Sequence, residues 1–259
     1  MTDKNEQDAP TVVITGGGAG IGRGTALHFA GKGWKVAALD KDGEALAELS
    51  ALLPGDRLLA IECDVGKEQA VADAFARIGE WTGGLDLLVN NAGIADPKSG
   101  PLENMTLEAW QGWIDASLTS AFLCSRAAVG MLRKRAPSAI VNVTSSRAVQ
   151  SEPDTYAYAA AKGGLFALTH ALAVSLGPDI RVNAVAPGWI ETGPWQKESD
   201  RSDPDHSKRA KQQHPVGRIG RVEDIAEAID WLSGEGSGFV TGQQIVIDGG
   251  MTRLMQYDA

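Results

Sequence analysis

Seven short runs of β-branched or apolar residues alternate along the chain with longer segments whose apolar positions recur at helical spacing. The predicted strands are Thr11–Thr15, Trp34–Asp40, Arg57–Val65, Leu85–Asn90, Ala139–Thr144, Ile180–Ala186 and Phe239–Asp248. The predicted helices between most of them are Ile21–Lys32, Glu44–Leu53, Lys67–Trp81, Trp113–Arg135, Tyr158–Leu176 and Val222–Ser233. Alternation of this kind is typical of a parallel sheet with helices on both faces. We therefore expect a doubly wound α/β fold.

Length and charge narrow the class of protein. A chain of 259 residues is within the range of one large α/β domain, and its hydrophobic fraction of 43% and charged fraction of 22% are those of a soluble globular protein. The net charge of −9 gives no electrostatic basis for binding nucleic acid or anionic lipid. Cys63 and Cys124 lie far apart, so neither a disulfide framework nor a CxxC site is expected. A small molecule is the expected partner.

The chain divides simply along its length. We expect residues 1–10 to form a disordered polar tail and residues 11–259 to form a single domain. There is no apolar leader and no run of about 18 apolar residues, so export and membrane spanning lack support and a cytoplasmic location is expected. The one long polar segment, Glu191–His214, carries Trp189 and Trp195 near its start. Long loops often bind ligands, so residues 189–214 are the predicted substrate loop.

A glycine-rich turn follows the first predicted strand. The sequence TGGGAGIG spans Thr15–Gly22, and a predicted helix follows at once. Glycines allow a ligand to approach the backbone closely, and the amides at a helix N-terminus suit a pyrophosphate. The spacing departs from a strict GxGxxG, so a plain tight turn is the alternative.

Asp40 ends the second predicted strand, about 20 residues beyond the glycines. A carboxylate at this place accepts hydrogen bonds from the adenosine ribose hydroxyls. It would also repel a 2′-phosphate, so NAD is favoured over NADP, although Lys41 next to it could soften that repulsion. A strand-end turn residue is the alternative role for Asp40.

Three motifs occur in order: TGGGAGIG at Thr15–Gly22, NNAG at Asn90–Gly93 and YAAAK at Tyr158–Lys162. Together they resemble the motifs of classical members of the short-chain dehydrogenase/reductase family. The similarity continues through Asp64 and Val65, RVNAVAPGWIET at Arg181–Thr192 and TGQQIVIDGG at Thr241–Gly250, and it covers nearly the whole chain. The resemblance implies a Rossmann-type fold and an NAD(P)-dependent oxidoreductase of a small alcohol or carbonyl compound.

The resemblance also implies cofactor contacts at the positions that match the family's motifs. Asp64 and Val65 would contact the adenine ring, Asn91 and Gly93 would line the adenosine ribose, and Asn90 would be structural. In the glycine turn and the nicotinamide segment, the implied positions are Gly16, Gly18, Ala19, Gly20, Ile21, Gly22, Pro187, Gly188, Ile190 and Thr192. Ile190 and Thr192 among them would hold the nicotinamide carboxamide.

Hydride transfer from an alcohol needs a base within hydrogen-bond reach of the hydroxyl proton. In YAAAK, Tyr158 and Lys162 are four residues apart and therefore share one helix face. An ammonium group beside a phenol favours the phenolate and lowers the pKa of the tyrosine. Tyr156 is a competing phenol, but Ala160 stands four residues after it. We predict Tyr158 as the general acid/base, with a chance Tyr–Lys pair on an amphipathic helix as the alternative. By resemblance, Lys162 also contacts the nicotinamide ribose.

Two further catalytic positions follow from the resemblance. Ser145, at the end of IVNVTSS, matches the family's serine that holds the substrate oxygen, with strand capping as its other role. The chain departs from the family at Ser117 in WIDASLTSAF, where members usually carry an asparagine that holds a water of a proton relay. A serine hydroxyl offers one donor where an amide offers two, so slower turnover is expected. An NAD-binding regulatory or scaffold protein with weak or no turnover is the alternative function.

The substrate is expected over the nicotinamide, bounded by residues 94–99, 147–152 and the substrate loop. Trp189 and Trp195 could form an apolar or sugar-stacking wall, whereas Arg147 could meet an anionic or polyhydroxylated substrate. A secondary alcohol, a sugar, a polyol and a ketoacyl compound all stay open. The histidines are scattered, so no metal is expected. The long helices Trp113–Arg135 and Tyr158–Leu176 resemble those through which family members pair, which implies a homodimer or homotetramer.

Overall fold

The structure is a computed structural model that describes residues 9–53 and 55–255. Its centre is a seven-stranded sheet in the order β3-β2-β1-β4-β5-β6-β9, in which every neighbouring pair is parallel. The strands are β1 (Thr11–Thr15), β2 (Lys35–Asp40), β3 (Leu58–Glu62), β4 (Leu87–Asn90), β5 (Ser138–Val143), β6 (Ile180–Pro187) and β9 (Gln244–Ile247). The predicted single-domain, doubly wound α/β fold is confirmed. Most of the predicted tail, residues 1–8, lies outside the described residues.

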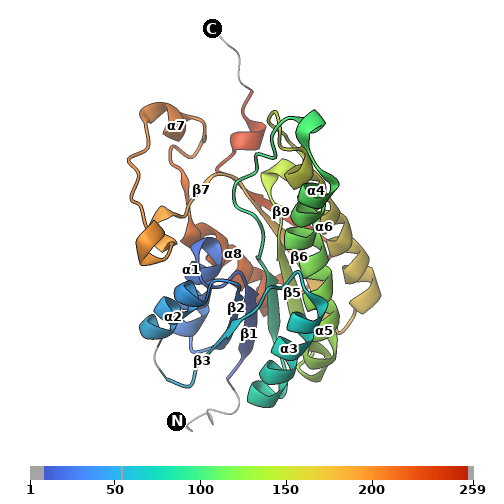
Figure 1. Ribbon diagram of the computed structural model, residues 1–259. Coiled ribbons are helices and arrows are strands. Elements are labelled where there is room, and N and C mark those ends of the chain that lie inside the picture. The colour runs from blue at the N-terminus through green and yellow to red at the C-terminus, as the bar shows by residue number, and fades with distance from the viewer. Residues whose placement is uncertain (1–8, 54, 256–259) are drawn as a thin grey trace.

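Helices cover both faces of the sheet (Figure 1). One layer consists of α1 (Gly20–Gly31), α2 (Gly43–Leu52) and α8 (Val222–Ser233). The opposite layer consists of α3 (Glu68–Thr82), α5 (Ser120–Lys134) and α6 (Tyr156–Leu176). All connections between these elements run from strand to helix to parallel strand, as the alternating sequence pattern predicts.

The central strands are buried on both faces, which explains their continuous apolar runs. In β1, Val13 packs into the layer of α3, α5 and α6, whereas Val12 and Ile14 pack into the layer of α1, α2 and α8. All three side chains are fully buried, and burial of each contributes about 1.5–3 kcal/mol. The register of β1, and with it the position of the glycine turn at its end, is therefore strongly fixed.

The predicted helix Trp113–Arg135 differs from the observed structure. The helix begins earlier, as α4 (Leu107–Ile114), because Thr106 caps it by accepting a 3.1 Å hydrogen bond from the amide of Ala109. A π-helical segment, η3 (Asp115–Thr119), then joins α4 to α5. Such π-helical turns occur frequently at functional sites, and this one contains Ser117.

The long polar segment between β6 and α8 contains short elements. β7 (Ile190–Glu191) pairs in parallel with β8 (Gly220–Arg221), and between them lie η5 (Gly193–Trp195), η6 (Glu198–Asp200) and α7 (Lys208–Gln212). The remaining short helices are η2 (Leu102–Asn104), η4 (Ser146–Ala148), η7 (Glu235–Ser237) and η8 (Met251–Arg253). The last strand, Gln244–Ile247, is shorter than the predicted run Phe239–Asp248. Gly242 has a positive φ, which interrupts the extended backbone, so the strand begins only after this residue.

Among the described residues, α6 is long and apolar enough to cross a membrane by length and composition. Its inner face packs against β5 and β6 and contains the buried polar side chains of Lys162 and Thr169. This arrangement is that of a helix in the layer of an α/β fold.

Candidate active site

The predicted site residues gather at one edge of the sheet. The strand order reverses between β1 and β4, and in open α/β sheets ligands bind at this switch point, beyond the carboxyl ends of the strands. The glycine turn follows the carboxyl end of β1, and the NNAG segment lies at that of β4. Ser145 follows β5, and the nicotinamide segment lies at the end of β6. The fold therefore brings together residues as far apart in the sequence as Gly16 and Thr192, as expected for a doubly wound sheet.

The glycine turn after β1 requires its glycines. Gly16 has a φ of +62°, a conformation that residues with a Cβ rarely adopt. A Cβ on Gly22 would lie 1.9 Å from the carbonyl oxygen of Gly16, which is far inside contact distance. The turn is therefore tight and free of side chains where the backbone would meet a ligand.

The amides at the start of α1 are also uncapped. Ala19 precedes the helix and supplies no side-chain hydrogen bond, whereas Asp42 caps α2 and Thr106 caps α4. The first intrahelical bond of α1 is donated by Arg23 to Ala19, so the three amides before Arg23 have no intrahelical acceptor. Uncapped amides beside a glycine turn fit the pyrophosphate of a dinucleotide.

Asp40 lies at the rim of this turn. Its Oδ2 accepts a 2.9 Å hydrogen bond from the amide of Gly18, and its Oδ1 accepts a 3.1 Å bond from the amide of Asp42. The carboxylate is thus fixed at the end of β2 beside the glycine turn. Asp64 and Val65 follow the neighbouring strand β3, and Val65 is buried whereas Asp64 is exposed.

The NNAG segment braces the glycine turn. Asn91 Nδ2 donates to the carbonyl oxygens of Thr15 (3.0 Å) and Gly16 (3.1 Å), and Thr15 Oγ1 accepts from the amide of Asn91. Asn90 is buried and donates to Asn142 Oδ1 at 2.8 Å, in agreement with its predicted structural role. The side-chain amide of Asn91 therefore holds the turn in shape, and its contact with a ribose stays a prediction.

Tyr158 and Lys162 share the inner face of α6, as predicted. Lys162 Nζ donates to the carbonyl oxygen of Val143 at 2.9 Å and lies 5.8 Å from the centre of the Tyr158 ring. The lysine side chain is only 4% exposed, and burial lowers its pKa to about 8. Trp113 packs edge to face on Tyr158, with ring centres 6.0 Å apart. Sequence reasoning missed Trp113, although its place four residues before Ser117 put it on the same helix face.

Ser145 lies at the end of β5 beside Tyr158. Its Oγ accepts a 3.1 Å hydrogen bond from the amide of Arg147. Burial raises the pKa of Tyr158, while a hydrogen bond with Ser145 and the positive charge of Arg147 lower it. The groups that lower the pKa of Tyr158 here are Ser145 and Arg147, and the effect of Lys162 on the phenol stays a prediction.

Ser117 and Gly93 complete the cluster around Lys162. A Cβ on Gly93 would lie 3.0 Å from Ser117 Oγ and 3.3 Å from Lys162 Nζ, so both polar groups converge on this glycine. Ser117 Oγ is buried and has no hydrogen-bond partner among the described residues. A buried hydroxyl of this kind typically binds an ordered water.

The predicted nicotinamide segment follows β6. A Cβ on Gly188 would lie 2.6 Å from Cβ of Asp248, so close packing against the end of β9 requires a glycine there. Thr192 and Gln196 lie 3.7 Å from the Cβ position of Gly20 at the start of α1. The segment that includes Ile190 and Thr192 therefore turns back towards the glycine turn, with Pro187 at its start.

Residues 193–201, which we call the strap, are tied to α2 by charges. Glu48 accepts hydrogen bonds from Arg23 Nη1 (3.0 Å), Arg201 Nη2 (3.3 Å) and the amide of Glu198 (2.7 Å). Lys197 adds ion pairs with Asp42 and Glu44. Sequence reasoning missed this contact, because charged residues about 150 positions apart give no local signal of pairing.

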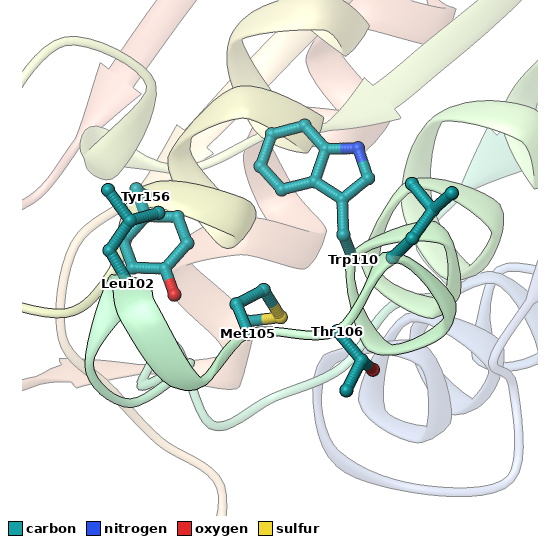
Figure 2. Close-up of a pocket in the computed structure, with 6 residues that line it drawn as sticks. Leu102, Met105, Thr106, Trp110 and Tyr156 are labelled. Carbon is teal, nitrogen blue, oxygen red and sulfur yellow. The ribbon is translucent and has the colours of Figure 1, made fainter.

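An apolar groove of about 460 Å³ lies beside the start of α6 (Figure 2). Tyr156 lines it together with Met105 and Trp110, and Trp110 stands one helical turn before Trp113. The hydroxyl of Tyr156 is buried and has no partner among the described residues. Tyr156 thus lines this groove, whereas Tyr158 contacts Ser145 and Trp113.

Comparison with known proteins identifies the family. The profile of the enoyl-(acyl carrier protein) reductase family matches residues 16–252. An uncharacterized oxidoreductase of Thermotoga maritima is 43% identical over 97% of this chain and 99% of its own length. Cis-4-hydroxycyclohexanecarboxylate dehydrogenase of Sinomonas cyclohexanicum is 37% identical over 93% of this chain and 96% of its own. The chain belongs to the short-chain dehydrogenase/reductase family.

Solved structures of short-chain dehydrogenases/reductases share the fold over almost the whole chain. An apo SCOR enzyme from Clostridium thermocellum has a TM-score of 0.85 and 34% identity, covering 96% of this chain and 95% of that one. ElxO with NADP bound (30% identity, 95% and 100% covered) and a 3-ketoacyl-(acyl-carrier-protein) reductase from Brucella melitensis with NADH (29%, 95% and 99%) each have a TM-score of 0.84. The protein is therefore an NAD(P)-dependent oxidoreductase of alcohol or carbonyl substrates.

Proposed function

We propose that the protein is an NAD(H)-dependent dehydrogenase or reductase that interconverts a small alcohol and its carbonyl compound, with Tyr158 as general acid/base. The observation that carries this proposal is the convergence of Tyr158, Ser145 and Lys162 beside a glycine turn that fits a pyrophosphate. A bound nicotinamide supplies or accepts the hydride. The residues of the chain then have to hold the substrate oxygen and move its proton.

Tyr158 and Ser145 divide these two tasks. The Ser145 hydroxyl, hydrogen-bonded with Tyr158, would hold the substrate oxygen. In oxidation the Tyr158 phenolate takes the proton from that oxygen, and in reduction the Tyr158 hydroxyl gives a proton to it. Tyr158→Phe is expected to lower kcat by at least about 100-fold with NADH binding retained. Tyr156→Phe is the matched control and should keep its turnover; loss of kcat in the control alone would move the assignment to Tyr156.

Lys162 and Ser117 supply the proton path behind Tyr158. Lys162 Nζ lies between the tyrosine ring and the carbonyl oxygen of Val143, and it also fits a contact with the nicotinamide ribose. Ser117 Oγ, which lies near Gly93 and Lys162, would hold a water that exchanges protons with the lysine.

Ser117→Asn tests this path and the scaffold alternative together. If the path limits turnover, the asparagine should raise kcat and reduce the solvent isotope effect, and Ser117→Ala should lower kcat. A protein that binds NADH but stays silent with either side chain, on all alcohols and carbonyl compounds tried, would be the regulatory or scaffold protein instead.

The preference for NAD is proposed from the carboxylate of Asp40. It is held at the rim of the glycine turn by two backbone amides, where it would accept from ribose hydroxyls and repel a 2′-phosphate. Related structures contain either NADP or NADH, so the family alone leaves the choice open. Asp40→Ala should weaken NADH binding and improve NADPH binding, measured by fluorescence titration. An unchanged ratio of the two dissociation constants would contradict the proposal.

The proposed substrate loop is residues 189–214, together with residues 94–99 and 147–152. In support, His206 pairs with Glu191 and lies edge to face on Trp189, so the loop folds over the end of the nicotinamide segment. The relative from Sinomonas cyclohexanicum is named for a cyclic hydroxy acid. This name favours a secondary alcohol as the class of substrate.

We also propose that the protein is a homodimer or homotetramer that pairs through α5 and α6. Phe122 on α5 is 45% exposed and Val174 on α6 is 85% exposed, although both are large apolar side chains. Sedimentation of the wild type against Phe122→Asp is the test. A wild type that sediments as a monomer at micromolar concentration would refute the pairing.

A further inference from the structure

Arg147 occupies a place between the catalytic serine and the catalytic helix. It lies in η4, two residues after Ser145, and its amide donates to Ser145 Oγ. η4 packs against α6, which carries Tyr158. The guanidinium is close enough to Tyr158 for its charge to lower the pKa of that hydroxyl. A cation therefore stands beside the place where the substrate oxygen would bind.

The guanidinium is only partly used by the protein. Its Nη2 forms a 2.6 Å ion pair with Glu152, which is 58% exposed on the segment before α6. Its Nε is buried and has no hydrogen-bond partner among the described residues. The side chain as a whole is 28% exposed, so other atoms of the same side chain border solvent. A buried donor of a charged group that lacks an acceptor is costly, and such a group in a native structure calls for an explanation such as a bound ion, a water or a role in catalysis.

The chemistry of this donor selects a kind of ligand. A guanidinium presents parallel N–H groups that match the two oxygens of a carboxylate. A single arginine that already carries one ion pair suits a singly charged anion better than a phosphate dianion, which would call for further cations. The ion pair with Glu152 keeps the side chain in position without using Nε.

We propose that Arg147 binds a carboxylate of the substrate, so that the substrates are hydroxy acids and the corresponding oxo acids. The proposal rests on the proposed dehydrogenase function, because it uses the same pocket beside Ser145 and Tyr158. In it, Arg147 is a specificity-determining residue: it orients the carbon skeleton by its charged end while Ser145 holds the reacting oxygen.

The test compares a charged and an uncharged substrate that have the same carbon skeleton. The α-, β- and γ-oxopentanoates are each assayed for NADH oxidation against their own methyl esters, with wild type, Arg147→Met and Arg133→Met. Arg133 is the matched control, because it forms an exposed ion pair with Asp179 at the far end of α5. Wild type and Arg133→Met should prefer the acid for at least one isomer. Arg147→Met should lower kcat/KM for that acid by roughly 10- to 100-fold more than it lowers kcat/KM for the ester, because the lost charge beside Tyr158 affects both substrates alike whereas the lost carboxylate contact affects only the acid.

Binding measurements separate the two proposals. Calorimetric titration of the same oxo acid into the protein with NADH should show binding that Arg147→Met abolishes. No turnover of any oxo compound, together with this binding pattern, would remove the dehydrogenase function but leave the carboxylate site standing. Equal losses for acid and ester in Arg147→Met, or a wild type that prefers the ester of every isomer, would overturn the carboxylate site, because Arg147 would then act only through its charge beside Tyr158 and its ion pair with Glu152.

Discussion

Replacing Lys162 by methionine is expected to stabilise the cofactor-free protein while it removes catalysis. Burial lowers the pKa of Lys162 from 10.5 to about 8, and one pKa unit corresponds to about 1.4 kcal/mol, so the charged lysine destabilises the folded state by about 3 kcal/mol. Its hydrogen bond to the carbonyl oxygen of Val143 offsets about 1 kcal/mol of this. Methionine has a similar length and no charge. The expected gain in the free energy of unfolding is about 2 kcal/mol at pH 7, the balance of these two estimates.

The pH dependence of this gain has a definite sign. Because the pKa of Lys162 is lower in the folded state than in the unfolded state, the unfolded chain binds more protons between about pH 8 and pH 10.5. The amount by which Lys162 destabilises the wild type therefore falls as the pH rises through that range. The advantage of Lys162→Met should be full at pH 7 and should shrink towards pH 10.

Urea denaturation of the wild type and Lys162→Met at pH 7, 8 and 9.5, followed by tryptophan fluorescence, measures both quantities. Lys211→Met is the matched control, because Lys211 is half exposed on the substrate loop and its replacement should change stability by less than about 0.5 kcal/mol. Equal or lower stability of Lys162→Met at pH 7, or an advantage that does not fall with pH, would refute the argument that burial of this charge is costly.

Three further predictions concern the residues around the catalytic group. Gly22→Ala should abolish NADH binding in a fluorescence titration, because its Cβ would lie 1.9 Å from the Gly16 carbonyl oxygen, whereas Gly31→Ala at the open end of the same helix should bind normally. Glu48→Gln should loosen the strap and raise the rate of NADH dissociation several-fold in stopped flow, while Glu68→Gln, which breaks an ion pair with Arg126 far from the strap, should not. Asn90→Ala should lower the free energy of unfolding by about 1–3 kcal/mol in urea, because it leaves the buried Asn142 Oδ1 without its donor.

The sheet and its helices were predictable because strands that are buried on both faces need continuous apolar runs in the sequence. β1 has the predicted bounds, and α8 begins and ends at the predicted residues. The edge of the sheet that carries the site was also predictable, because the motifs follow the predicted strands. The least accurate boundary, the start of α4, depended on the cap at Thr106, which lies outside the apolar repeat.

What sequence could not supply were contacts set by tertiary geometry. The π-helical segment around Ser117 has the same residue types as an ordinary helix, so its altered hydrogen bonding leaves no periodic signal. The strap joins Glu48 to Arg23 and Arg201 through side chains alone. The raised pKa of Tyr158 likewise depends on how much burial outweighs Ser145 and Arg147, and that balance exists only in three dimensions.

These observations share one physical basis. Lys162 is a buried cation, Ser117 Oγ and Arg147 Nε are buried donors without partners among the described residues, and α1 begins with uncapped amides. Each feature destabilises the fold locally, and all of them lie at the carboxyl edge of the sheet, around one place. Polar groups that the protein itself leaves incompletely satisfied at the carboxyl edge of the sheet are what is expected where ligands complete the hydrogen bonding.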